Sequence, residues 1–98
     1  MAPQQRRYKL KASDDTAAFT RDLHPQIKQK IRAALKIILE NPDAGKALRD
    51  ELAGLKSFRV GKFRIVYRMV QRNIIEIVTI GPRKTIYEET YRLLHKKP

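Results

Sequence analysis

Cysteine and histidine are scarce in this chain of 98 residues: there is no cysteine, and the two histidines are His24 and His95. Without cysteine the protein has no disulfides, no thiolate metal sites and no cysteine nucleophile. Two widely separated histidines are too few to suggest a zinc site. The acidic residues lack metal-ligand spacing and are expected to be helix caps or surface charge. The sequence therefore predicts no metal and no cofactor.

Long apolar runs are also missing. No stretch approaches the roughly 18 residues needed to span a bilayer, and the N-terminus, MAPQQRR, has no apolar signal-peptide core. We therefore expect a cytoplasmic protein without membrane contact. A hydrophobic fraction of 42% and a charged fraction of 33% are typical of a soluble globular chain. The length predicts one domain over residues 1–98, with residues 1–5 as a loose tail.

Negative charge is the third scarcity. The chain has ten acidic residues and 22 lysines and arginines, so its net charge is +12. Between Gly54 and Lys84 there are eight cations and a single acid, Glu76. Cationic surfaces attract nucleic acids, anionic membranes and acidic proteins. A membrane-binding protein would carry its cations on an amphipathic helix, whereas here they lie on predicted strands, which favours nucleic acid.

The first half of the chain predicts a strand and two helices. Arg6–Ala12 alternates polar and apolar residues, as a half-buried strand does. Ser13 is placed to cap a helix over Asp14–Leu23. A second helix begins at Pro25 and ends before Asn41-Pro42. Its apolar residues recur at helical spacing and should face the core: Ile27, Ile31, Ala34, Leu35, Ile38 and Leu39.

The second half predicts three antiparallel strands and a last helix. Ala44–Leu52 is expected to be a short, weak helix or an ordered loop. The strands are expected at Leu55–Val60, Phe63–Val70 and Ile74–Ile80, and the helix at Ile86–His95. The first two strands join through the glycine turn Gly61-Lys62, and Gly81-Pro82 is expected to end the third. The fold class is therefore α+β, a single compact domain with a twisted sheet.

Arginines gather on these strands. Because side chains alternate along a strand, Arg64 and Arg68 share one face of Phe63–Val70. Arg59 before the hairpin turn and Arg83 after the last strand could reach the same face. Converging guanidinium groups bind phosphate and stabilise the charge of a phosphorane transition state. The pattern equally suits the solvated outer face of a sheet, so the residues alone leave both interpretations open.

Tyrosines follow this basic segment. Tyr87 lies four residues after Arg83, and Tyr91 lies one helical turn further on. Surrounding cations stabilise a phenolate, which is one route to a general base without histidine. Both tyrosines could instead anchor the last helix to the core. His95 is a weaker candidate near the end of that helix, and His24 is expected to be a helix-junction residue.

The run LKSFRVGKFRIVYRM from Leu55 and the run IGPRKTIY from Ile80 resemble the RelE family of toxins within the RelE/ParE superfamily. The resemblance covers nearly the whole chain. It implies a ribosome-dependent endoribonuclease (mRNA interferase) that cuts mRNA in the A site. A ribose 2′-hydroxyl attacks the adjacent phosphodiester, without a metal, and leaves a cyclic phosphate and a free 5′-hydroxyl.

The resemblance also assigns residues. It implies that Arg64 stabilises the transition-state phosphate, Arg83 assists the leaving oxygen and Tyr87 is the general base. The residues expected to hold the RNA are Lys56, Arg59, Lys62, Arg68 and Lys84. Two positions depart from the family pattern, because Ser57 stands where a well-studied relative has a lysine and Pro82 where many have histidine or lysine.

Partners follow from the same resemblance: the ribosome and its mRNA, and a RelB-like antitoxin, acidic and partly disordered, in a hetero-oligomer with the toxin. Two other functions stay open. One is a ParE-like inhibitor of DNA gyrase, which shares the fold and cuts no RNA. The other is a non-catalytic module that binds RNA or the ribosome.

Overall fold

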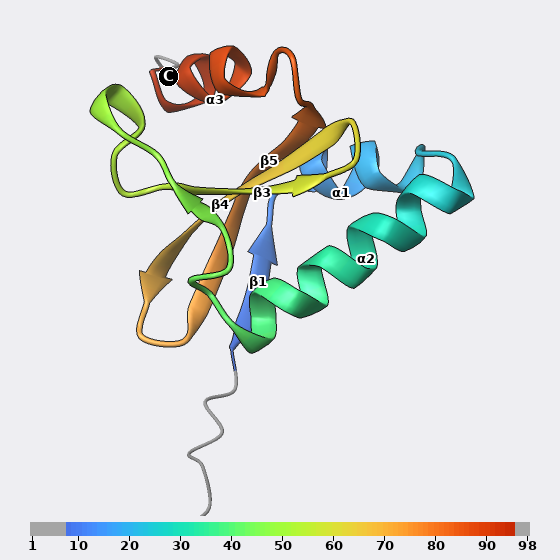
Figure 1. Cartoon of the computed structure of the whole chain (residues 1–98), viewed down its shortest axis with the longest axis horizontal. Helices are drawn as coiled ribbons and strands as arrows, with labels where there is room; N and C mark the ends of the chain where they lie inside the picture. Colours follow the sequence, from blue (N-terminus) through green and yellow to red (C-terminus); the bar gives the residue numbers. More distant parts are fainter. Residues whose placement is uncertain (1–7, 96–98) are drawn as a thin grey trace, which may run out of the picture.

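One mixed sheet organises the molecule, which we describe from a computed structural model over residues 8–95. The elements in chain order are β1 (Lys9–Ala12), α1 (Asp14–Arg21), α2 (Pro25–Glu40), β2 (Lys46–Ala47), a 3-10 helix η1 (Asp50–Leu52), β3 (Lys56–Val60), β4 (Phe63–Gln71), β5 (Ile74–Pro82) and α3 (Ile86–Leu94). The strand order is β1-β5-β4-β3-β2 (Figure 1), with β1 parallel to β5 and the other pairs antiparallel. The predicted α+β fold is confirmed.

Local capping explains where the first two helices begin. The Ser13 hydroxyl accepts a hydrogen bond of 3.1 Å from the Thr16 amide, as expected of an N-cap. His24 caps α2 through Nδ1, which accepts from the Gln26 amide at 3.2 Å. Its φ of −55° and ψ of 140° lie in the polyproline II region, which a residue before proline prefers. α1 ends at Arg21, two residues before the predicted end at Leu23.

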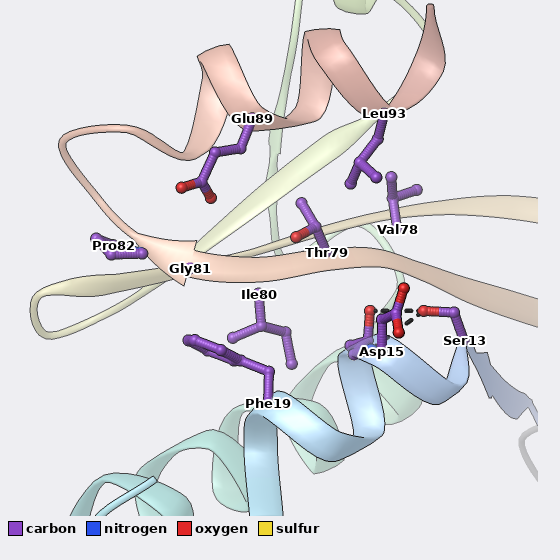
Figure 2. A pocket seen from close by; sticks show the side chains of 11 residues that line it. Ser13, Asp15, Phe19, Val78, Thr79, Ile80, Gly81, Pro82, Glu89 and Leu93 are labelled. Atoms are coloured by element: carbon purple, nitrogen blue, oxygen red, sulfur yellow. Dashed lines mark hydrogen bonds between the residues drawn. The ribbon is translucent and has the colours of Figure 1, made fainter. Parts of the chain in front are cut away.

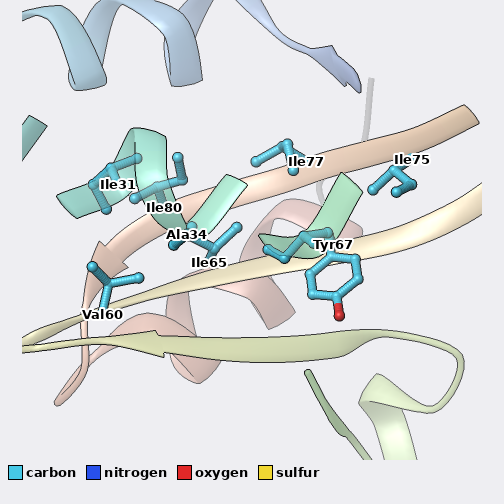
Figure 3. Packing of buried hydrophobic residues seen from close by; sticks show 9 residues of the cluster. Ile31, Ala34, Val60, Ile65, Tyr67, Ile75, Ile77 and Ile80 are labelled. Atoms are coloured by element: carbon cyan, nitrogen blue, oxygen red, sulfur yellow. The ribbon is translucent and has the colours of Figure 1, made fainter. Parts of the chain in front are cut away.

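The main core lies between α2 and one face of the sheet (Figure 3). The predicted apolar stripe of α2 packs there against inward-facing strand residues such as Ile65, Ile75 and Ile77. Tyr67 is 1% exposed, and its hydroxyl is held by loop backbone, donating to the Pro42 carbonyl and accepting from the Gly45 amide, both at 2.8 Å. This core fixes which face of β4 points away from α2.

A smaller core forms on the opposite face, beneath α3 (Figure 1). Ile86 at the start of α3 packs with Leu55 and Val66, and all three are buried. Since Val66 alternates with Ile65 and Tyr67, the sheet has an α2 face and an α3 face. Arg64 lies two residues from Val66 and therefore belongs to the α3 face.

Two local expectations were wrong and a third was incomplete. β1 is not half-buried, because it is an edge strand and Lys9–Ala12 are all exposed. The segment before β3, expected as a short, weak helix or an ordered loop, contains the short 3-10 helix η1 and also forms the unpredicted strand β2. β5 continues through Gly81 to Pro82, whose Cα partners are Arg64 and Phe63. Proline is tolerated there because β1 covers only the first half of β5.

The expected tail of residues 1–5 lies outside the described residues. Within residues 8–95, no helix has both the length and the apolar character needed to cross a membrane.

Candidate active site

The register of the sheet brings two predicted arginines side by side on the α3 face. Arg59 of β3 lies directly opposite Arg64 of β4, and Ser57 lies opposite Val66. Directly opposed residues have Cβ atoms about 5 Å apart. The hairpin therefore carries Ser57, Arg59 and Arg64 on one face, close to the first turn of α3.

Ser57 joins two of the three groups for which catalytic roles were predicted, Arg64 and Tyr87. Its Oγ accepts a hydrogen bond from Arg64 Nη1 at 3.2 Å and another from the Tyr87 hydroxyl at 3.4 Å. The Arg64 guanidinium carbon lies 5.8 Å from the centroid of the Tyr87 ring, within cation–π range. Ser57 is 2% exposed, so the two side chains meet over a buried hydroxyl. We call Ser57, Arg64 and Tyr87 the Ser57 cluster.

The packing of the α3 helix on the sheet places Tyr87 next to Ser57. Ile86 is fully buried against Val66 and Leu55, which fixes the first turn of the helix on the sheet. Tyr87, the next residue, then lies half-buried over β3. The anchoring and the catalytic interpretations of this tyrosine are therefore compatible, since Tyr87 packs on the smaller core and also presents its hydroxyl to Ser57.

Arg83 lies at the tip of the β3–β4 hairpin. Its amide donates to the Lys62 carbonyl at 2.7 Å, so the end of β5 is tied to the turn. Arg83, Arg59 and Lys62 line one side of a pocket of about 500 Å³, which we call the hairpin-tip pocket. Lys30 of α2 lines it as well. A smaller hollow of about 290 Å³ adjoins it and is lined by Lys62, Pro82, Arg83 and Lys84.

Two of the predicted RNA-binding residues are engaged elsewhere. Lys56 lies opposite Tyr67 and pairs with the Asp43 carboxylate, away from the Ser57 cluster. The Lys56 ammonium holds the pKa of Asp43 below its ordinary value through a hydrogen bond and its charge. Arg68 is on the α3 side of β4, but its Nε donates to Glu76 at 2.6 Å. Both the Lys56 ammonium and the Arg68 guanidinium are therefore already paired with a carboxylate in this structure.

The residues at the end of α3 form a separate contact. Tyr91 stacks on His95 with ring centroids 4.1 Å apart, and His95 Nδ1 lies 2.9 Å from the Tyr91 carbonyl. Both side chains are exposed, and no hydrogen bond joins either one to the Ser57 cluster among the described residues.

An acidic pocket lies between α1, β5 and α3 (Figure 2). Its volume is about 320 Å³, and Asp15 and Glu89 line it together with apolar residues such as Phe19 and Leu93. No lysine or arginine lines it. Its charge therefore disfavours a phosphate, whereas the hairpin-tip pocket attracts one. Across residues 8–95, no three histidines, cysteines or carboxylates gather in a way that could hold a metal ion.

Sequence reasoning missed two features of this surface. Ser57 was noted only as a replaced lysine, and Lys30 was not singled out at all. Alternation along β3 does place Ser57 on the same face as Arg59, but its meeting with Arg64 depends on the register. Nothing in the α2 sequence shows that Lys30 will lie beside a hairpin tip more than 30 residues away.

Comparison with known proteins now decides the family. Residues 6–87 match the sequence profile of a family described as the ParE toxin of the type II toxin–antitoxin system parDE. The chain belongs to the RelE/ParE superfamily of type II toxins. The resemblance to a RelE-family toxin seen in its motifs is thereby confirmed. Among curated protein sequences, none matches this toxin significantly.

Solved structures similar to this toxin are toxins as well. The RelBE2 toxin–antitoxin complex of Mycobacterium tuberculosis has a chain with 28% identity and a TM-score of 0.67, covering 78% of this toxin and 98% of that chain. A doubly substituted E. coli RelE in the free state has 19% identity, a TM-score of 0.68, and coverages of 86% and 90%. The YoeB–YefM complex of Staphylococcus aureus gives 24% identity, a TM-score of 0.64, and coverages of 76% and 95%. The two with lower identity show the shared fold.

Proposed function

We propose that this toxin is a ribosome-dependent mRNA endoribonuclease that cuts in the A site without a metal. The observation that carries the proposal is the Ser57 cluster: a guanidinium and a phenol hydrogen-bonded to the same buried hydroxyl on a strongly basic surface. Phosphoryl chemistry needs a positive group for the phosphate oxygens and a base for the nucleophile, and the cluster holds both side by side.

The reaction transfers a phosphoryl group within the RNA. Tyr87, as the phenolate, accepts the proton of a ribose 2′-hydroxyl, and the 2′-oxygen forms a bond to the adjacent phosphorus. Arg64 donates hydrogen bonds to the phosphate oxygens, whose negative charge grows in the transition state. The bond from phosphorus to the 5′-oxygen breaks, and that oxygen leaves with the electron pair and takes a proton from water. Arg83 stabilises the leaving oxygen by its charge.

Ser57 serves as a positioning residue in this scheme. Both of its hydrogen bonds use Oγ as acceptor, so one buried hydroxyl holds the Arg64 guanidinium and the Tyr87 phenol together. The lysine that a relative carries at this position would add a positive charge. Here the serine instead holds the Arg64 guanidinium in place.

The surrounding cations would hold the RNA. Arg59 lies next to Arg64, and Lys62 and Lys84 surround Arg83, so phosphates on either side of the cut can be bound. Lys56 and Arg68 would contribute after exchanging their carboxylate partners for phosphate. Because the ribosome presents the mRNA in a fixed pose, orientation can supply several kcal/mol of the barrier reduction.

The inhibitory partner in this proposal is a RelB-like antitoxin that forms a hetero-oligomer with the toxin. One of the solved structures similar to this toxin, RelBE2, is a toxin–antitoxin complex. An acidic segment that folds on binding would complement a chain of net charge +12.

The decisive experiment maps mRNA 5′ ends on translating ribosomes after induction of the wild type, Arg83→Ala and Tyr87→Phe. We expect codon-phased cuts with the wild type and a loss of cuts with both variants. Codon-phased cleavage that survives both substitutions would contradict the assigned roles. Ribosome association without cleavage or toxicity would instead identify a non-catalytic binding module.

A second candidate function is inhibition of DNA gyrase. The description of the matching family, ParE, favours it, whereas the Ser57 cluster has no use in a protein that cuts no RNA. Trapped gyrase–DNA complexes together with intact mRNA after induction would establish this alternative.

A further inference from the structure

We propose that the hairpin-tip pocket is a nucleotide subsite, in which the nucleotide next to the scissile phosphate places its base against Phe63 and its phosphate among Lys30, Lys62 and Arg83. The proposal rests on the endoribonuclease function above and extends its site beyond the Ser57 cluster, through Arg59 and Arg83, to the hairpin tip. Its argument comes from the charge, the lining and the position of the pocket.

The charge of the hairpin-tip pocket favours binding of an anion. Four cations line it, namely Lys30, Arg59, Lys62 and Arg83, and no carboxylate does. None of these four is among the cations of residues 8–95 that have a carboxylate partner within 4 Å, which are Lys56, Arg68 and Arg92. Like charges gathered without a counter-charge repel one another, and an anion bound between them relieves that repulsion.

The apolar residues of the pocket favour a ligand that has an apolar part, and not an inorganic ion alone. Ile27 from α2 and Val60, Gly61 and Phe63 from the hairpin complete the lining. A volume of about 500 Å³ lies within the usual range of small-molecule sites, which combine an apolar floor with a few polar groups. An aromatic side chain beside cations is also the common arrangement for binding single-stranded nucleic acid, since every base has a face that can stack.

Three parts of the chain build this pocket. Ile27 and Lys30 lie three residues apart on α2 and therefore share one side of the helix. Lys62 occupies the β3–β4 turn, which is opened by Gly61 with φ of 59°. Arg83, the residue after β5, is tied to that turn through its amide. The pocket is thus built by a helix, a hairpin and the segment that follows β5.

The position of the pocket links it to the Ser57 cluster. Arg59 lines the pocket and is also the direct cross-strand neighbour of Arg64. The pocket is also lined by Ile27 and Lys30 of α2, so a strand of RNA whose scissile phosphate lies at Arg64 would pass over Arg59 and around the hairpin tip to place its next nucleotide there. A partner peptide rich in carboxylates would satisfy the cations but would leave the apolar floor unused, so we favour RNA.

The test is a titration of the full-length, isotope-labelled protein, followed by NMR, with a short single-stranded RNA in which every 2′-hydroxyl is methylated. Such RNA binds but cannot be cut. We compare Lys30→Gln with Lys36→Gln, an exposed lysine on the same helix that lines no described pocket. Phe63→Leu keeps an apolar side chain and removes the aromatic face.

Amide shifts at Gly61, Lys62 and Phe63 are expected on addition of millimolar RNA. Lys30→Gln should weaken binding about 2- to 5-fold, as the loss of one exposed charge contact does. It should also lower the slope of log K against log salt by about 0.7. Lys36→Gln should change neither quantity. Phe63→Leu should weaken binding about 5-fold or more through lost stacking.

Absence of shifts at these amides, or equal effects of the two lysine variants, would overturn the subsite. Tighter binding of a poly-glutamate peptide at the same amides would assign the pocket to a protein partner. The readout does not depend on cleavage. If the protein binds RNA in this pocket but leaves mRNA intact on ribosomes, only the endoribonuclease function is refuted. If mRNA is cleaved normally and Lys30→Gln binds RNA as tightly as the wild type, only the subsite is refuted.

Discussion

Replacing Ser57 with alanine is the sharpest test of how the candidate active site works. The substitution removes one buried hydroxyl and leaves Arg64 and Tyr87 without their common hydrogen-bond acceptor. Alanine fits the space, so the sheet and both cores should persist. The expected effect is therefore on the geometry of two side chains and not on the fold.

The magnitude follows from the two hydrogen bonds. A bond to a charged donor contributes about 1.5–3 kcal/mol and a bond between neutral groups about 0.5–1.5 kcal/mol. The lengths of 3.2 and 3.4 Å lie at and beyond the long end of the usual range. We therefore count mainly the bond from Arg64 and expect a loss of about 1.5–3 kcal/mol of transition-state stabilisation. This corresponds to a fall of about 10- to 150-fold in kcat.

The assay is single-turnover cleavage of mRNA in a purified ribosomal complex, with KM obtained separately. We expect kcat to fall and KM to change little, because the cations that hold the RNA are untouched. Thr79→Val is the matched control: Thr79 lies opposite Val66 on the same sheet face, so this variant also loses a hydroxyl from that face but leaves the cluster intact. It should cleave at the wild-type rate.

Cleavage by Ser57→Ala at the wild-type rate would refute a positioning role for Ser57. A lower Tm with an unchanged rate per folded molecule would assign Ser57 to stability alone. Restoration of the rate in Ser57→Thr, which keeps the hydroxyl, would support the role of the hydrogen bonds.

The other predictions concern stability, measured by chemical and thermal denaturation. Tyr67→Phe leaves the Gly45 amide and the Pro42 carbonyl without their partner and should lower the free energy of unfolding by about 2 kcal/mol, or Tm by about 8–16 °C. Burial raises the pKa of Tyr67 above its ordinary 10.0. The stability that the neutral phenol contributes is therefore complete below pH 10 and is lost as the pH rises through the folded-state pKa. Above pH 10 the wild type should lose stability relative to Tyr67→Phe, and parallel curves of unfolding free energy against pH would contradict this. Gly45→Ala should cost about 1–3 kcal/mol, because the new Cβ would lie 2.5 Å from the buried Tyr67 hydroxyl oxygen. Gly81→Ala should cost less, because its nearest neighbour, at 2.9 Å, is the movable carboxylate of Glu89; an equal or larger cost would contradict the geometry.

The sequence by itself determined the elements that have strong local signals. The α2 helix was predictable from its apolar stripe, its opening proline and the Asn41-Pro42 stop, all of which act within a few residues. The three long strands were predictable from alternation and from the glycine turn at Gly61. The motifs around Arg64 and Arg83 also indicated the superfamily, since they lie within short runs of sequence.

Weak local signals missed β2 before β3 and ended β5 too early. β2 and η1 depend on pairing with β3 and on the loop that packs around Tyr67, and neither contact can be read from Ala44–Leu52 alone. The burial of β1 was overestimated because alternation does not reveal that a strand lies at the edge of a sheet.

Tertiary structure alone decided which basic residues work together. The sequence lists the cations between Gly54 and Lys84, but the register sets Arg59 beside Arg64, and the packing of Ile86 brings Tyr87 to Ser57. The fold also pairs Lys56 with Asp43 and brings Lys30 to the hairpin tip. Charge is a property of composition, whereas a site requires distances of a few ångströms between residues far apart in the chain, and only folding sets those distances.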